Sequence, residues 1–241
     1  MHEDEVSHTA LQVAAARAAH LRFDPPPHLL IDPHAETLLG EAGAEMIASH
    51  GEEARSWILH ENRLFLPFRA RFAEDRLAEA YARGTRQLLI LGAGLDSYAF
   101  RVPDDQAGLR IYEVDHPASQ GWKRSRIEAL GWELPDALSF VPCDFEKTRI
   151  SGALEGSDWS AHEPAFVMWL GVTYYLDPQT TRTTLRDLHG KLGAGSEIVL
   201  DYMLPLEDLP ARYQDLQRQI AAERGLDLVP EHRHCRGGRP R

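Results

Sequence analysis

Five short apolar runs follow one another between residues 86 and 204, separated by stretches that can be helical. The runs are too continuously apolar to alternate between a buried and a solvent-exposed face. Such runs are typical of strands buried on both faces of a parallel sheet flanked by helices. We therefore predict an α/β fold with a doubly wound, mostly parallel sheet. The predicted strands lie within "RQLLILGAG", "LRIYEVD", "LSFVPCD", "PAFVMWLGV" and "SEIVLDYML".

A helical pattern precedes the first of these strands. Apolar residues recur at helical spacing in "SHTALQVAAARAAHL", where Ser7 or Thr9 is the candidate N-cap, and four prolines between residues 24 and 34 then interrupt the pattern. The last helix of this region ends at Gly84, a favourable C-terminal stop. Residues 1–84 thus form a predicted N-terminal helical segment. The predicted helices cover residues 7–21, 35–49 and 64–83.

A further helix is predicted between the fourth and fifth strands. Asp177 is its N-cap and Pro178 its first residue, and the helix stops near Gly193. These elements define a cofactor-binding domain over residues 85–225. The remaining residues, 226–241, contain "HRHCRGGRPR" and are expected to form a disordered tail.

The stretch after the fifth run has room for a helix over residues 206–225 and for one short candidate strand, Leu226 to Val229. We expect the C-terminal strands of a complete sheet to be truncated here, so that the fifth strand presents an edge with unpaired backbone groups. A homodimer or larger assembly would bury this edge. In the alternative, a monomer, the helix over 206–225 shields it.

Composition narrows the classes of partner. The 241 residues carry a formal net charge of −11, whereas binding to nucleic acid needs clustered Lys and Arg. The N-terminus is acidic, unlike a secretory signal, and no apolar run approaches the ~18 residues of a membrane span. Only Cys143 and Cys235 are present, which implies no disulfide framework. We expect a cytoplasmic protein with a small-molecule partner, bound neither to nucleic acid nor to a membrane.

The first predicted strand runs into a glycine turn. Gly92 and Gly94 lack a Cβ, which lets the backbone turn tightly and approach a ligand, while Ser97 stands where a dinucleotide fingerprint has its third glycine. Asp115 closes the second strand 21 residues after Gly94, where a carboxylate can accept both hydroxyl protons of a ribose. The alternatives are a turn without a ligand and Asp115 as the N-cap of the next helix.

The glycine turn and the carboxylate of Asp115 together indicate an adenosine-type ligand, either NAD or S-adenosylmethionine. Asp144 and Phe145 end the third predicted strand, where the acid can accept from an adenine amino group and the ring can pack on the purine face. This second acid favours S-adenosylmethionine. The chain also has no room for a separate substrate domain, and no Tyr is followed four residues later by a Lys, as in short-chain dehydrogenases.

Several segments resemble a known family: "HTALQVAAARAA", "RARFAEDRLAEAYARGTRQLLILGAGLDSYAFR", "YEVDHPASQGWKRSRI", "VPCDFEK" and "WLGVTYYLDP". They are similar to the leucine carboxyl methyltransferase family, in its bacterial small-molecule O-methyltransferase branch. The combination of LGAGLD with EVDxP is specific, and the resemblance spans roughly residues 7–215. It implies a class I methyltransferase fold, which is Rossmann-like, with S-adenosylmethionine as methyl donor. Transfer to a carboxylate or hydroxyl of a small molecule is the implied reaction.

The resemblance also implies roles for individual residues. Arg69, three residues before an aromatic, matches the arginine that binds the methionine carboxylate. The family commonly carries a glutamate before the glycine of the motif after the fourth strand, but here Leu170 precedes Gly171, so one polar cofactor contact is expected to be missing. The other implied cofactor-binding residues are Gly92, Ala93 and Gly94 in the turn, Asp115 with His116 at the ribose, and Asp144 with Phe145 at the adenine.

A methyl acceptor oxygen must be held in line with the sulfonium methyl group, and water must be excluded. A carboxylate acceptor needs no general base, whereas a phenol needs one, for which His116, Tyr174 and Tyr202 are equivalent candidates. Tyr174 and Tyr175 can equally pack beneath the mouth of the pocket. No metal site is expected, because His232, His234 and Cys235 stand in the tail without a fourth ligand.

Two alternatives of other classes remain open at this point. One is a nicotinamide-dependent oxidoreductase, and the other is a cofactor-binding protein that has lost turnover through its shortened C-terminus. The identity of the acceptor cannot be read from the residues, because those that would select it lie in the variable helical segment and near the C-terminus.

Overall fold

The computed structural model describes residues 7–51, 57–215 and 218. The chain divides into two compact units, Met1–Asp201 and Tyr202–Arg241, which are treated separately here. The first unit contains the whole sheet together with the helices that precede it. The predicted tail over 226–241 and the candidate strand within it lie outside the described residues.

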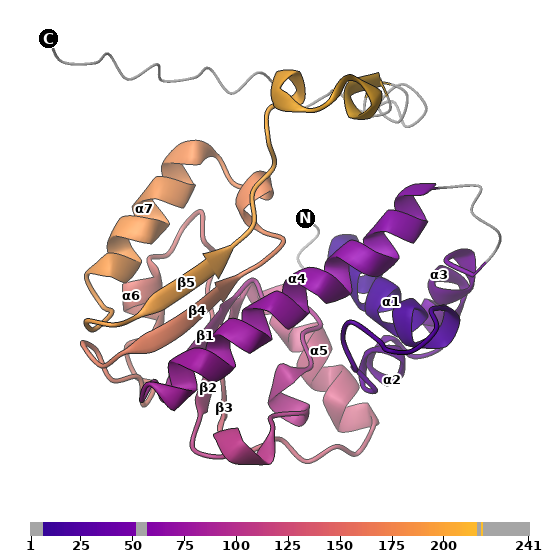
Figure 1. Ribbon diagram of the computed structural model, residues 1–241. Helices are drawn as coiled ribbons and strands as arrows, with labels where there is room; N and C mark the ends of the chain where they lie inside the picture. The colour runs from indigo at the N-terminus through magenta and orange to yellow at the C-terminus, as the bar shows by residue number, and fades with distance from the viewer. Residues whose placement is uncertain (1–6, 52–56, 216–217, 219–241) are drawn as a thin grey trace, which may run out of the picture. The chain divides into compact units, whose positions relative to one another are not determined.

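A five-stranded parallel sheet forms the centre of the first unit, in the order β3-β2-β1-β4-β5 (Figure 1). All five apolar runs form strands, so the predicted α/β sheet is confirmed. Every residue of β1 and of β4 is buried, because both strands are central and covered on both faces. The strands are β1 Gln87–Leu91, β2 Arg110–Asp115, β3 Leu138–Pro142, β4 Ala165–Trp169 and β5 Glu197–Leu200.

Two separate apolar clusters pack on the two faces of the sheet. One joins Ile90 and Phe166 to Leu77 of α4, the helix Trp57–Ala82. The other joins Leu89 and Val167 to helices on the opposite face, α6 Ile150–Ala153 and α7 Pro178–His189. Alternate strand residues therefore face opposite clusters, which makes the sheet doubly wound, as predicted.

Helix α7 begins as the sequence predicts. Asp177 is its N-cap, and the carboxylate accepts hydrogen bonds from the backbone N–H groups of Gln179 and Thr180 at 2.8 and 3.0 Å. Pro178 occupies the first helical position, where its missing N–H has no cost. The helix ends at His189, one turn before the predicted stop.

The described residues before the sheet are mostly helical, and the helix ends differ from the predicted ones. Ser7 precedes α1, His8–Phe23, but neither Ser7 nor Thr9 caps it through its side chain. The helix predicted over 35–49 is two helices, because Gly40 has a φ of +66° that breaks the first. These are α2 Ala35–Leu39 and α3 Ala44–Ser49, separated by the 3₁₀ turn η1 Glu41–Gly43.

Helix α4 begins two turns earlier than the predicted residue 64, although Pro67 stands in its interior. Arg63 secures this early part, since its guanidinium pairs with Asp24 at 2.9 Å and donates to the carbonyl of His50 at 2.5 Å. Such contacts with α1 and α3 are not visible in the local pattern. In Figure 1, α4 runs along the sheet and α1 to α3 gather at its N-terminal end.

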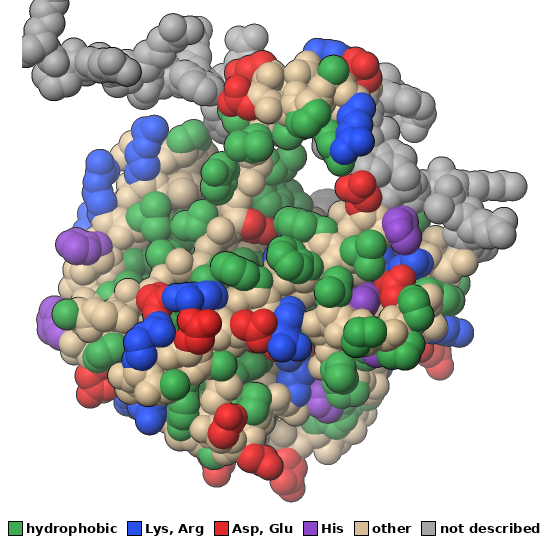
Figure 2. Space-filling view, viewed as in Figure 1, with side chains coloured by type: hydrophobic (Ala, Val, Ile, Leu, Met, Phe, Trp, Pro, Cys, Tyr) green, Lys and Arg blue, Asp and Glu red, His purple; other side chains and the backbone are tan. Residues whose placement is uncertain are grey.

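The exposed face of α4 carries charged side chains in addition to apolar ones. Arg71 pairs with Asp75 and Arg76 with Glu79 at helical spacing, and all four side chains are more than one third exposed. Figure 2 shows adjacent Lys or Arg and Asp or Glu side chains across the middle of this face. Such exposed pairs contribute little to stability, so they provide controls for the buried ion pairs described below.

The connections between the strands also contain helix α5, Pro117–Ala129, and three short 3₁₀ turns. These turns are η2 Tyr98–Phe100, η3 Asp104–Gln106 and η4 Thr173–Tyr175. Among the described residues, β5 is an edge strand. Residues 206–215 and 218 of the predicted 206–225 helix are described, in the second unit: 206–208 form the 3₁₀ turn η5, 209–210 are not helical, and 211–215 and 218 are helical. No described helix is both long and apolar enough to cross a membrane.

Candidate functional site

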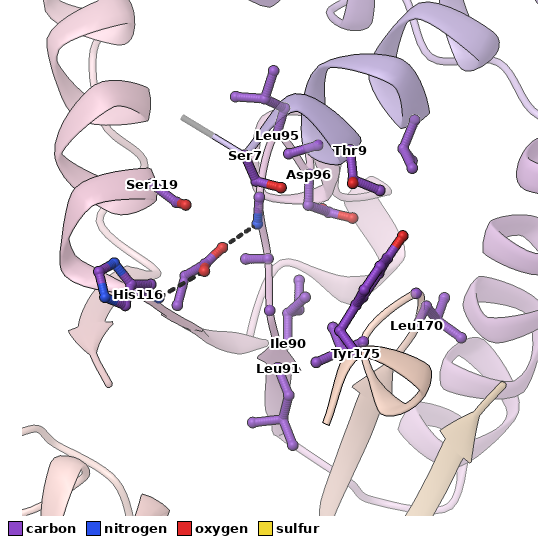
Figure 3. A pocket seen from close by; sticks show the side chains of 18 of the residues that line it. Ser7, Thr9, Ile90, Leu91, Leu95, Asp96, His116, Ser119, Leu170 and Tyr175 are labelled. Atoms are coloured by element: carbon purple, nitrogen blue, oxygen red, sulfur yellow. Dashed lines mark hydrogen bonds between the residues drawn. The ribbon is translucent and has the colours of Figure 1, made fainter. Parts of the chain in front are cut away.

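A cavity of about 620 Å³ opens at the carboxyl ends of the strands. Its wall comes from the segments that follow β1, β2, β3 and β4, together with the start of α1 and the middle of α4. This is where an open α/β sheet binds ligands, and the volume suits a small molecule. Figure 3 shows His116 and Ser119 on one side of the cavity and Leu170 and Tyr175 on the other, with Ile90 and Leu91 between them.

We call these two walls the α5 side and the α4 side. The α5 side comprises Gly94, Asp115, His116, Ser119, Asp144 and Phe145. The α4 side comprises Leu66, Arg69, Ala70, Leu170, Gly171 and Tyr175. All of the cofactor-binding residues predicted from the sequence thus lie in one cavity, since Gly92 and Ala93 line it between the two sides.

The glycine turn requires glycine for two reasons. Gly92 and Gly94 have φ values of +67° and +52°, in the left-handed region that other residues rarely adopt. A Cβ on Gly92 would also lie 2.3 Å from Cγ2 of Val172, and one on Gly94 would lie 3.0 Å from Cβ of Ala10. The turn is therefore pressed between the loop after β4 and the first turn of α1.

Asp115 holds the glycine turn in place. One carboxylate oxygen accepts a hydrogen bond from the backbone N–H of Gly94, and the other accepts from the N–H of His116 at 2.6 Å. Burial raises the pKa of the Asp115 carboxyl, and these hydrogen bonds oppose the rise. Because a carboxylate offers about four acceptor sites, Asp115 retains capacity for ligand hydroxyls. It is not the N-cap of α5, which is His116.

Asp144 and Phe145 follow β3 on the same side. The Asp144 carboxylate pairs with Lys147 at 2.8 Å and accepts from the N–H of Glu146 at 3.0 Å. The hydrogen bond from Lys147 lowers the pKa of the Asp144 carboxyl, which therefore stays an acceptor. The Phe145 ring packs near Trp169, with ring centroids 6.4 Å apart. An acid and an aromatic face thus adjoin, as the sequence predicts.

A buried ion pair supports the α5 side from below. Lys123 of α5 lies 2.5 Å from the Glu113 carboxylate of β2, and both side chains are 1 % exposed. Lys123 also donates to the carbonyl of Asp96 at 2.6 Å, within the loop that follows the glycine turn. Burial raises the pKa of Glu113 to about 7, and Lys123 opposes that rise. This pair fixes the loop against the sheet.

The α4 side is built around Arg69. Its side chain is 10 % exposed, and Nη1 lies 2.6 Å from the Asp201 carboxylate, directly after β5. Gly171, with a φ of +75°, allows this approach, because a Cβ there would lie 2.7 Å from Nη2 of Arg69. The predicted anion-binding arginine therefore lines the cavity, and it already has an acidic partner.

Leu170 lines the cavity and packs against the apolar cluster beneath α4. No carboxylate stands at this position, where the resemblance would place a glutamate. An acidic group on this side is Asp201, whose other carboxylate oxygen accepts from the N–H of Gly171 at 2.7 Å. Sequence reasoning missed Asp201, because the predicted strand run continues to Leu204 and hides that the strand ends at Leu200, directly before this acid.

The three candidate bases are not equivalent in the structure. His116 caps α5 through Nδ1, 3.3 Å from the N–H of Ala118, and stands on the α5 side. Burial raises the pKa of the Tyr174 phenol, so this hydroxyl stays protonated at neutral pH. Tyr175 rather than Tyr174 lines the cavity, and its side chain points inward in Figure 3. Tyr202 belongs to the other unit and is 70 % exposed.

Within the described part of the chain, no group of three or more His, Cys, Asp or Glu side chains is placed so that it could hold a metal ion. His232, His234 and Cys235 lie outside the described residues. Cys143 is a buried free thiol that lines the cavity, and burial raises its pKa to about 11. A thiol of this kind is unreactive at neutral pH.

Comparison with known proteins decides between the ligands that the glycine turn leaves open. The profile of the family "Leucine carboxyl methyltransferase" matches residues 10–189. YktD of Bacillus subtilis (strain 168), which carries the name of an S-adenosyl-L-methionine-dependent methyltransferase, is 32 % identical over 84 % of this chain and 72 % of its own length. A relative of the same description from Saccharopolyspora erythraea is 32 % identical over 91 % of this chain and 75 % of its own.

Among solved structures, one described as a methyltransferase from Thermobifida fusca YX has a TM-score of 0.48 at 21 % identity, covering 83 % of this chain and 77 % of that one. The family assignment rests on the sequence matches, which span the glycine turn, Asp115 and Asp144. The chain belongs to the leucine carboxyl methyltransferase family, and it is an S-adenosylmethionine-dependent methyltransferase of class I fold.

Proposed function

We propose that the protein is an O-methyltransferase that transfers the methyl group of S-adenosylmethionine to a carboxylate or hydroxyl of a small molecule. The observation that carries this proposal is the single cavity of about 620 Å³, which joins Asp115 and Asp144 on one side to Arg69 on the other. This volume is compatible with a cofactor and a small acceptor together. The family of the chain supports the same reaction class.

The α5 side would hold the nucleoside. Asp115 would accept from the ribose hydroxyls, and Asp144 from the adenine amino group, with the Phe145 ring against the purine face. Gly92 and Gly94 give the backbone the left-handed conformation that this turn needs at the edge of the cavity. These residues fit the chemistry of the nucleoside without rearrangement of their donors and acceptors.

The α4 side would hold the aminoacyl end. A guanidinium has five N–H donors in a planar fork, and Arg69 commits Nη1 to Asp201, which leaves donors for a ligand carboxylate. When bound, S-adenosylmethionine supplies a methyl group already activated by its sulfonium. The chain therefore orients the acceptor oxygen and excludes water, and these tasks need no covalent chemistry from the protein.

The acceptor would occupy the rest of the cavity, lined by Val13 of α1, by Leu66 and Ala70 of α4 and by Tyr175. A carboxylate acceptor is ionised at neutral pH and attacks without a base. His116 stands on the opposite side, next to Asp115, so we assign it to the nucleoside rather than to proton transfer. Tyr174, protonated at neutral pH, is likewise not assigned as a base.

The test is transfer of a labelled methyl group from S-adenosylmethionine to a panel of small acceptors that offer carboxylate, phenol, amine or thiol groups. We expect methyl ester or methyl ether products, and saturable calorimetric binding of S-adenosylhomocysteine but not of NAD. Labelled amine or thiol products alone would overturn O-methylation. Cofactor binding without transfer to any acceptor would instead indicate a binding protein.

A further inference from the structure

Asp201 joins three segments that are distant in the sequence. Its carboxylate pairs with Arg69 of α4 at 2.6 Å and accepts from the backbone N–H of Gly171, after β4, at 2.7 Å. Its own carbonyl accepts the hydroxyl hydrogen bond of Thr173 at 2.5 Å. One residue at the end of β5 thus ties α4 to the loop that lines the cavity.

The environment of the ion pair restricts the Arg69 side chain. The Arg69 and Asp201 side chains are 10 % and 17 % exposed, so the pair is largely shielded from water. On its other side the guanidinium lies against Gly171, where a Cβ would meet Nη2 at 2.7 Å. The guanidinium also hydrogen-bonds the Tyr174 hydroxyl, so it is held by a carboxylate, a phenol and a backbone turn.

The charges of this arrangement also suit an aminoacyl group. That group carries a carboxylate, and the Arg69 guanidinium lines the cavity, where it can pair with this carboxylate. Residue 170, which also lines the cavity, is a leucine and supplies no carboxylate. A planar fork that is already fixed binds a carboxylate at a smaller entropic cost, because a free arginine loses rotamer entropy on ordering.

We propose that Asp201 is a positioning residue that fixes Arg69 for the carboxylate of S-adenosylmethionine. This inference rests on the proposed placement of the aminoacyl end on the α4 side. Asp201 acts through Arg69 and through the loop at Gly171, and it does not contact the reacting atoms.

The experiment compares two ligands in calorimetric titrations. S-adenosylhomocysteine carries the aminoacyl end, whereas 5′-methylthioadenosine has the same nucleoside without it. Asp201→Asn retains an acceptor for the N–H of Gly171 but loses the charge that holds Arg69. We expect the affinity for S-adenosylhomocysteine to fall roughly tenfold and the affinity for 5′-methylthioadenosine to change less than twofold, effects typical of a lost charged hydrogen bond.

The matched control is Glu197→Gln. Glu197 lies at the start of β5 and pairs with Arg76 of α4 at 2.7 Å and with Arg83 directly after α4, so this variant also removes ion pairs between β5 and the α4 region, at residues that do not line the cavity. Both ligand affinities should remain unchanged in it. A double-mutant cycle with Arg69→Gln provides the second measurement, because Asp201→Asn should have no further effect on S-adenosylhomocysteine binding once Arg69 is absent.

Several results would overturn the inference. Equal loss of both ligands in Asp201→Asn would indicate a structural role only, and tighter binding of S-adenosylhomocysteine would show that Asp201 competes with the ligand for Arg69. An undiminished effect of Asp201→Asn in the Arg69→Gln background would exclude action through Arg69. If Asp201→Asn does not fold, Asp201→Glu replaces it, because it keeps the charge but displaces the carboxylate from Arg69, and the same selective loss of S-adenosylhomocysteine binding is expected. Failure of the unaltered protein to bind either ligand would instead overturn the proposed function.

Discussion

The two sides of the cavity are built in different ways. On the α5 side, Gly94 follows β1 and Asp115 ends the adjacent strand β2, 21 residues later, so the single connection between these strands brings them together. On the α4 side, Arg69 and Asp201 are 132 residues apart and meet only after the sheet has formed. The α5 side is therefore formed by contacts between residues that are close in the sequence, whereas the α4 side depends on correct packing of a helix against an edge strand.

This difference predicts which ligand groups each side controls. A nucleoside should bind even when the α4 side is damaged, because its contacts belong to β1, β2 and β3. The aminoacyl group should lose affinity whenever α4 or the end of β5 shifts. Comparing S-adenosylhomocysteine with 5′-methylthioadenosine separates the two contributions, and the following variants test this separation in order of expected effect.

The largest effect should follow from removing the support beneath the α5 side. Lys123→Met leaves Glu113 buried without its partner, and breaking a buried pair in this way costs about 3–5 kcal/mol. Denaturant unfolding measures the loss. Arg71→Met is the control, since its pair with Asp75 is exposed and should contribute ~1 kcal/mol or less. Comparable losses in both variants would contradict the importance of the buried pair.

The second prediction concerns how the free energy of unfolding depends on pH through Glu113. Burial raises its pKa from 4.5 to about 7, so between these values the folded protein binds more protons than the unfolded chain. The associated stability is fully present below pH 4.5 and is lost as the pH rises to 7, on the order of 3 kcal/mol. Glu113→Gln should unfold with a flatter pH profile over this window. Parallel profiles of the two proteins would show that Glu113 does not titrate there.

Removal of the acid at the end of β2 should come third. Asp115→Ala is expected to weaken the binding of both ligands by ~1.5–3 kcal/mol, because both carry the ribose and a charged hydrogen-bond partner is lost. Calorimetric titration gives both constants. Asp105→Ala, an exposed acid in η3, serves as the control. Unchanged dissociation constants in a folded Asp115→Ala protein would remove Asp115 from the site.

A smaller and selective effect is expected on the α4 side. Arg69→Lys keeps the charge but loses the planar fork, so S-adenosylhomocysteine should bind about 1 kcal/mol more weakly while 5′-methylthioadenosine is unaffected. The ratio of the two affinities is the measurement. If the Arg69→Lys variant binds S-adenosylhomocysteine as tightly as the unaltered protein does, bidentate recognition of the carboxylate is refuted.

The smallest expected effect is a gain. Leu170→Glu places a carboxylate beside Gly171, where it can pair with the ammonium of the aminoacyl end and tighten binding of S-adenosylhomocysteine by roughly 0.5–1 kcal/mol. Leu170→Gln controls for the change in shape and polarity. Weaker binding in the Glu variant would mean that the pocket is adapted to an apolar residue, in keeping with the packing of Leu170 on the cluster beneath α4.

Most of the α5 side could be predicted because its signals are short-range. A buried strand, a turn that needs φ values above zero and an acid at the end of the next strand each leave a pattern within about 30 residues. Gly92, Gly94, Asp115 and Asp144 all line the cavity, as these patterns predict. The start of α4 could not be predicted in the same way, since Arg63 secures it through Asp24 and His50.

The sequence by itself determined the five strands, their mostly parallel arrangement and the placement of the glycine turn and its acid, because these follow from short apolar runs and the segments that directly join them. Only the tertiary structure decided that Arg69 faces Asp201, that Tyr175 rather than Tyr174 lines the cavity, and that Lys123 holds the loop at Asp96. Such contacts depend on how helices pack on the sheet, and packing is set by the summed fit of many side chains rather than by any local pattern.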